Sequence, residues 1–203
     1  MGDSLDLVPI GGWRGQGRKK KWISPWLVAT YDPRDGTLGS VCRVMSGFTD
    51  VFYRENTVRY MGAEFGGGAA DDEGDGADAV EGGEEEEEGD EEDEEGEGGA
   101  YESDGDGGAG GGGSAALRVA CAAEGVETGE RPPFWFRPSE VWEIRGADVT
   151  VSPVHKSALG LVHAERGLSL RFPRFIRKRP DKRLADATTP EQLAEIYRKQ
   201  AAS

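Results

Sequence analysis

The 203-residue sequence has only two cysteines, two histidines and no long apolar run. Cys42 and Cys121 lack the paired spacing of a zinc site, and His155 and His163 have no Cys or His partners at ligand intervals. No apolar stretch approaches the ~18 residues of a membrane-spanning helix. Asp6 stands where N-myristoylation expects Ser or Thr. The sequence therefore predicts two thiols without a metal, and no membrane anchor.

Basic residues are absent from one long segment, residues 64–116. This segment holds 22 of the 39 acidic residues and none of the 24 Lys and Arg, so the formal charge of -15 describes neither part of the chain. The remaining residues carry 24 basic against 17 acidic side chains. A net charge of -15 would argue against a nucleic-acid partner. The residues outside 64–116 are net basic, however, so a nucleic-acid partner stays compatible with the sequence.

Segment 64–116 is rich in Gly, Asp and Glu and has almost no aliphatic or aromatic residues. It cannot bury enough apolar surface to offset the entropy of ordering, so we expect a disordered insertion. Three interpretations stay open: a solvated loop without function, a phosphate mimic that shields a basic face, and a binder of histones or other basic proteins. Residues 1–63 and 117–203 are then two parts of one domain of sufficient size for a single core.

Short alternating runs predict a domain built mainly of strands. Residues 5–10 alternate up to a Gly-Gly pair, and residues 26–31 form a β-rich run that ends at the turn signal DPRDG. Residues 38–45 return as the second arm of a hairpin. Further strands are expected at 141–151 around a bulge at Gly146, at 168–172 and at 175–178.

Two helices complete the expected architecture. Residues 48–60 predict a short helix capped by Ser46 or Thr49, and Thr189 opens a capping box at the start of a final helix. Five or so short strands, with one helix between them and one at the end, predict a mainly β OB-fold, a small Greek-key barrel.

The densest functional signal is the stretch 166–182, RGLSLRFPRFIRKRPDK, in which cations are interleaved with Leu, Phe and Ile. This pattern suits a surface that holds phosphate with one set of side chains and packs with the other. Arg18 and Lys19 lie in a Gly-rich basic loop suited to following a phosphate backbone, although a nuclear-import signal or a merely soluble loop fits as well. Arg43 emerges from an apolar strand, where a solvated strand face is the alternative.

The motifs SLRFPRFIRKRPDK and DATTPEQLAEIYRKQ resemble the carboxy-terminal signature of eukaryotic ATP-dependent DNA ligases of the DNA ligase I type. DSLDLVPIGGWRGQGRKKKW, SVCRVMSGF and VWEIRGADVTVSPVH are similar to that family in the same order, and SVCRVMSGF resembles its plant and algal branch. The resemblance covers essentially all of the chain outside the acidic segment. It implies the OB domain of a multidomain enzyme that seals nicks through a lysyl-AMP and a DNA-adenylate.

The resemblance also implies roles for single residues. Arg179, Asp181 and Lys182 match the family's R-x-D-K element, whose cations contact the β- and γ-phosphates of ATP. Asp181 is expected to orient Arg179 or Lys182 by an ion pair. Phe172 matches an aromatic that inserts into the minor groove near the nick, with a core Phe as the alternative. DNA contacts are further implied for Arg18, Lys19, Arg43, Arg171 and Arg174.

The chain departs from the family pattern because it begins at the first OB strand. The K-x-D-G nucleophile and the metal-binding carboxylates are absent, so this chain alone is expected to be inactive, with no catalytic residue and no metal site of its own. ATP and Mg²⁺ would be bound mainly by an upstream nucleotidyltransferase domain. The implied partners are nicked duplex DNA and the upstream nucleotidyltransferase and DNA-binding domains, and we expect a nuclear monomer. A stand-alone nucleic-acid-binding module and an acidic histone or repair interaction protein are the alternatives.

Overall fold

The first three strands form an antiparallel meander, which contains the predicted hairpin as its second and third strands. β1 (Ser4–Arg14) pairs with β2 (Ile23–Tyr31), and β2 pairs with β3 (Leu38–Val44). The computed structural model describes residues 4–66 and 116–201. β1 does not end at Gly11-Gly12, because irregularities in the β1–β2 register on either side of this pair let the strand bend and continue.

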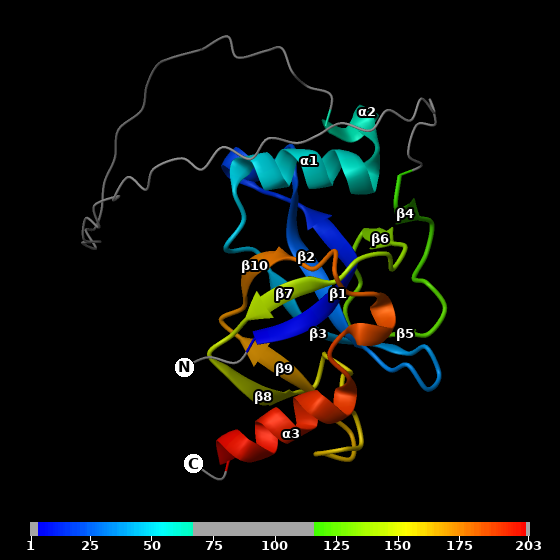
Figure 1. Cartoon of the computed structure of the whole chain (residues 1–203). Coiled ribbons are helices and arrows are strands. Elements are labelled where there is room, and N and C mark those ends of the chain that lie inside the picture. Colours follow the sequence, from blue (N-terminus) through cyan, green and yellow to red (C-terminus); the bar gives the residue numbers. More distant parts are fainter. Residues whose placement is uncertain (1–3, 67–115, 202–203) are drawn as a thin grey trace, which may run out of the picture. The chain divides into compact units, whose positions relative to one another are not determined.

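Two later strands close the meander into a barrel. β7 (Trp142–Arg145) pairs with the free edge of β1, and β10 (Arg174–Lys178) pairs with β7. The start of β10 meets the end of β3 through a parallel bridge between Ser46 and Arg174. The order β1-β2-β3-β10-β7, with a helix between the third and fourth of these strands along the chain, is that of an OB-fold barrel (Figure 1).

The helix between β3 and β7 is α1 (Asp50–Met61), and its N-cap is Thr49. The Thr49 hydroxyl accepts a hydrogen bond from the backbone N–H of Phe52 at 3.1 Å, which selects Thr49 over Ser46 as the cap. The short helix α2 (Ala63–Gly66) follows, so the predicted start of the disordered insertion at residue 64 is wrong. The ring of Phe65 packs against that of Phe134 at 5.4 Å, which ties this turn to the barrel. The rest of the predicted insertion, 67–115, lies outside the described residues.

The single strand predicted at 141–151 is two strands with different partners. β8 (Asp148–Ser152) leaves the barrel and pairs with β9 (Gly167–Arg171) in a separate two-stranded sheet. Gly146 lies at the break, where a Cβ atom would come within 2.3 Å of the Leu170 side chain. Gly146 is therefore required by close packing against β9 and not by a bulge within one strand.

The final helix α3 (Pro190–Ala201) begins at the predicted capping box. The N–H of Thr189 donates to Gln192 Oε1 at 2.9 Å, and the N–H of Gln192 donates to Thr189 Oγ1 at 3.3 Å. The helix packs on the second sheet, where Val149 N–H donates to Gln200 Oε1 at 2.9 Å. In Figure 1, α1 and α2 lie at one end of the barrel and α3 lies beside β8 and β9.

Several short elements carried no periodicity from which they could be predicted. They are the strands β4 (Arg118–Val119), β5 (Val126–Glu127) and β6 (Phe134–Phe136), and the 3₁₀ turns η1 (Gly17–Lys19) and η2 (Leu184–Asp186). β6 pairs with both β1 and β4, and β5 runs parallel to β3.

The barrel core is aromatic. The fully buried ring of Trp26 contacts the rings of Tyr60, Phe136 and Trp142, with centroid distances of 4.9, 5.3 and 5.1 Å. Phe175 of β10 joins this core against Trp142 at 5.4 Å. Among the described residues, no helix is long and apolar enough to cross a membrane.

Candidate functional site

The predicted Arg179, Asp181 and Lys182 come together in the turn that follows β10. Arg179 N–H donates to the Val141 carbonyl at 2.8 Å, and Lys182 N–H donates to the Arg179 carbonyl at 3.1 Å, so the turn is fixed to the barrel. Asp181 accepts from Nε and Nη2 of Arg179 at 3.0 and 2.8 Å. Of the two partners expected for Asp181, the structure therefore pairs it with Arg179, in a bidentate contact.

A fourth residue, Asp6 of β1, joins the two cations, and no sequence pattern indicated it. Asp6 Oδ1 accepts from Nη1 of Arg179 at 3.1 Å, and Asp6 Oδ2 accepts from Nζ of Lys182 at 2.6 Å. Next to it, Glu143 of β7 accepts from Nε of Arg177 at 2.8 Å. We call this set the Arg179 cluster; its members are Asp6, Glu143, Arg177, Arg179, Asp181 and Lys182.

The Arg179 cluster balances three carboxylates against three cations. The hydrogen bonds from Arg179 lower the pKa of Asp181 to about 2, and Asp181 in turn raises the pKa of Arg179. Hydrogen bonds from Arg177 and then from Ser4 lower the pKa of Glu143. The Asp181 and Glu143 carboxylates are therefore held ionised at neutral pH. Arg179 and Lys182 retain further N–H donors for another anion.

Phe172 lies at the other end of β10, in the connection from β9. Its side chain is 73% exposed, and its φ of 50° places a non-glycine residue in the left-handed region. The guanidinium of Arg171 lies 4.9 Å from the Phe172 ring centroid. The structure therefore excludes the core alternative for Phe172 and places Arg171 beside it. An exposed aromatic on a strained backbone is typical of a binding position.

A chain of contacts joins the Phe172 turn to the basic loop between β1 and β2. Lys19 Nζ donates to the Met45 carbonyl at 3.4 Å and to the Tyr53 hydroxyl at 3.0 Å. The hydroxyl of the next residue, Ser46, donates to the Pro173 carbonyl at 2.9 Å. We call the resulting set the Phe172 surface; its members are Lys19, Met45, Ser46, Arg171, Phe172 and Arg174.

Two exposed residues at or next to the Phe172 surface, Met45 and Arg145, were not predicted. Met45 is 54% exposed although its side chain is apolar. Arg145 of β7 stands directly opposite Arg174 in the β7–β10 ladder, and both are exposed. Two like charges directly opposite each other on neighbouring strands destabilise the sheet. The Arg145–Arg174 pair therefore indicates a surface that binds an anionic partner.

The other predicted DNA contacts lie nearby on β3 and in η1. Arg43 is two residues before Met45, is 45% exposed and stacks over the Trp13 ring at 4.2 Å. Its Nε and Nη2 donate to the Glu130 carboxylate at 2.9 and 2.5 Å. Arg43 is therefore held in an ion pair, which differs from the solvated strand face that was the alternative interpretation. Arg18 is exposed in η1, next to Lys19.

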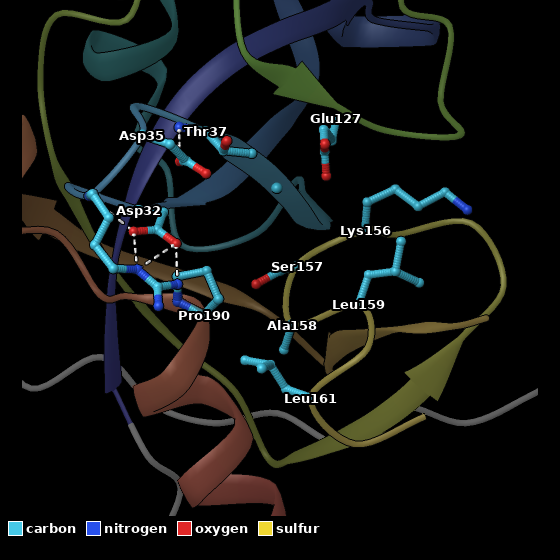
Figure 2. A pocket seen from close by; sticks show the side chains of 12 residues that line it. Asp32, Asp35, Thr37, Glu127, Lys156, Ser157, Ala158, Leu159, Leu161 and Pro190 are labelled. Carbon is cyan, nitrogen blue, oxygen red and sulfur yellow. Dashed lines mark hydrogen bonds and ion pairs between the residues drawn. The ribbon is translucent and has the colours of Figure 1, made fainter. Parts of the chain in front are cut away.

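A separate pocket contains none of the predicted site residues. Figure 2 shows Ser157, Leu159 and Leu161 along one side of it, and Asp32 and Asp35 on another. Asp32 is engaged by Arg34, and Asp35 accepts from the Thr37 backbone N–H. Within residues 4–66 and 116–201 there is no group of three or more Cys, His, Asp or Glu that could hold a metal ion.

Comparisons with known proteins point to one family. The family model of the ATP dependent DNA ligase C terminal region matches residues 115–182. Over 200 residues, the chain is 39% identical to DNA ligase 6 of Arabidopsis thaliana, covering 98% of this chain and 10% of that protein. It is 40% identical over 199 residues to DNA ligase 3 of Schizosaccharomyces pombe, covering 98% of this chain and 19% of that protein.

The chain thus spans less than a fifth of the length of these two curated relatives. Among solved structures, the ligase domain of M. tuberculosis LigD is 14% identical with a TM-score of 0.49, covering 92% of this chain and 38% of that one. The fold assignment above therefore rests on the strand order of this chain itself.

Proposed function

We propose that the chain is the OB domain of a nick-sealing enzyme of the ATP-dependent DNA ligase family, whose C-terminal region its sequence resembles. One observation carries the proposal. Arg179 and Lys182 are held side by side on the carboxylate of Asp6, at the point where the family match ends. Two neighbouring cations with spare donors form a site for a polyphosphate.

We propose that Arg179 and Lys182 contact the β- and γ-phosphates of ATP while AMP is transferred to a lysine of an upstream nucleotidyltransferase domain. Negative charge accumulates on the departing pyrophosphate, and fixed cations aimed at it lower the barrier. Asp181 orients Arg179 through its bidentate contact. The carboxylates of the Arg179 cluster are engaged by cations, so Mg²⁺ would be held by the upstream domain.

The Phe172 surface would bind the nicked duplex. In OB-folds, nucleic acid binds across the second and third strands and the loops between strands one and two and between strands four and five. Arg18 and Lys19 lie in the first of these connections, Arg43 on the third strand, and Phe172 in the second connection. The cations Arg18, Lys19, Arg43, Arg171 and Arg174 would contact phosphates, and Phe172 would insert into the minor groove.

The same proposal includes the setting of the enzyme. Nicked duplex DNA, ATP and the upstream nucleotidyltransferase and DNA-binding domains are the partners, and the complete enzyme acts as a monomer in the nucleus. The support for the DNA and ATP partners is the identity to DNA ligases of a plant and a fungus over nearly the whole chain.

The decisive test uses this chain joined to its nucleotidyltransferase domain. Lys182→Ala should reduce self-adenylylation by at least tenfold while sealing of pre-adenylylated nicks changes far less. Lys156→Ala, in the unrelated pocket, is the matched control. Equal loss of both steps would contradict the role of Lys182. Residues 1–203 alone should form no AMP adduct with labelled ATP, and a covalent adduct would contradict the proposed division of labour.

A further inference from the structure

Asp6 links the first strand to the last loop of the barrel, across more than 170 residues of sequence. Its backbone is fixed in three ways. It pairs with Glu143 in the β1–β7 ladder, its N–H donates to Thr188 Oγ1 at 2.9 Å, and its carbonyl accepts from Thr188 N–H at 2.8 Å. The backbone that carries the Asp6 carboxylate is therefore fixed by the fold itself.

The two oxygens of this carboxylate take one cation each. Oδ1 holds Nη1 of Arg179 and Oδ2 holds Nζ of Lys182, and the side chain of Asp6 is only 17% exposed. Both cationic side chains are long and would otherwise adopt many rotamers. A single rigid anion thus sets the spacing between a guanidinium and an ammonium.

We propose that Asp6 is the positioning residue of the polyphosphate site: it holds Arg179 and Lys182 at the spacing of two linked phosphates. This inference rests on the proposed function of the Arg179 cluster and adds a residue to it. Asp6 acts through the two cations and does not touch the phosphates. Its negative charge opposes anion binding, so it contributes only through the order that it imposes on the two cations.

The ordering of the two cations by Asp6 and the repulsion between Asp6 and phosphate predict opposite effects of removing this carboxylate on pyrophosphate binding. If Asp6 only competed with phosphate, removing its charge would strengthen binding of every phosphate ion. If Asp6 sets the spacing, its removal weakens a ligand that spans both cations and hardly affects a ligand that contacts one. Inorganic pyrophosphate and inorganic phosphate are the two matched probes.

The experiment titrates residues 1–203 with each ion and follows backbone amide chemical shifts by NMR. Asp6→Ala and Asp6→Asn should each weaken pyrophosphate binding about tenfold, while phosphate binding changes less than about twofold. The control is Glu195→Gln, which removes one negative charge from the pocket that Asp6 and Lys182 also line. Glu195→Gln should leave the ratio of the two affinities unchanged.

The outcomes distinguish a failure of the positioning role of Asp6 from a failure of the phosphate site itself. Stronger binding of both ions by the Asp6 variants, or an unchanged ratio, would overturn the positioning role of Asp6 alone. Pyrophosphate binding that is absent, or that Lys182→Ala does not weaken, would overturn the proposed phosphate site and the inference with it. Amide spectra of the β1 and β7 residues show whether Asp6→Ala has kept the barrel, and the isosteric Asp6→Asn serves where it has not.

Discussion

The hydroxyl of Ser46 donates a hydrogen bond to the carbonyl of Pro173 at 2.9 Å, so the residue after Met45 holds the turn that presents Phe172. The same junction carries the bond from Phe175 N–H to the Ser46 carbonyl at 3.0 Å. Gly47 follows with a φ of 85°, and a Cβ there would come within 2.2 Å of the Phe175 carbonyl oxygen. The contact that closes the barrel is thus also the contact that exposes Phe172.

Phe172 and Phe175 should respond oppositely to truncation. Phe172→Ala should leave thermal stability nearly unchanged and reduce affinity for a nicked duplex, because the ring is 73% exposed. Phe175→Ala should cost about 3–5 kcal/mol of unfolding free energy, since its ring is buried against Phe48, Phe52 and Trp142. Thermal unfolding and fluorescence anisotropy with nicked DNA measure both effects.

Phe172→Gly refines this comparison. Glycine adopts the left-handed region without strain, so this variant should be about 1 kcal/mol more stable than Phe172→Ala while binding DNA equally weakly. A DNA affinity equal to that of the unaltered chain would show that the ring takes no part in binding.

Arg43 is restrained by Glu130, and releasing it should strengthen DNA binding. Glu130→Gln is expected to raise affinity at low salt, because the Arg43 guanidinium then lacks its charged competitor. Arg43→Ala should lower affinity and reduce the salt slope of log K by about 1. Arg34→Ala, in the ion pair with Asp32, is the control and should change neither quantity.

The Arg179–Asp181 pair should persist to unusually low pH. The pKa of Asp181 falls from 3.8 to about 2, chiefly through hydrogen bonds from Arg179. Because the folded-state pKa is the lower one, the stabilisation is complete above the ordinary pKa and is lost as pH falls from about 4 to about 2. NMR titration of the Asp181 carboxyl carbon measures it. Arg179→Ala should return the pKa towards 3.8, whereas Arg177→Ala should chiefly raise the pKa of Glu143.

The shielding interpretation of the acidic segment can now be tested without damage to the fold. Deletion should remove 67–115 and keep residues 64–66, since Phe65 contacts Phe134 and lies 4.1 Å below the guanidinium of Arg14. Shielding predicts that the deletion raises DNA affinity at low salt and that the gain disappears as salt is added. Unchanged affinity at low salt would leave the segment without this role.

The local sequence pattern was sufficient to predict those features that are formed by residues close together in the sequence. The capping box at Thr189 and the turn after Tyr31 follow from side chains within a few residues of each other, and both were predicted. The prediction of one strand at 141–151 was wrong. Apolar and polar residues continue to alternate through Gly146, but β7 before it pairs with β1 and β10, whereas β8 after it pairs with β9. Nothing local indicates that Leu170 occupies the space beside Gly146.

The sequence by itself determined the main barrel strands and the two long helices, the separation of acidic from basic residues and the motif that ends at Lys182, because these depend on composition and short spacings. Only the tertiary structure decided that Asp6 joins Arg179 to Lys182 and that Phe172, and not Phe175, faces solvent. Barrel closure brings residues from the two ends of the chain within hydrogen-bonding distance. The register of β10 against β3 and β7 then sets which side of RFPRF is buried.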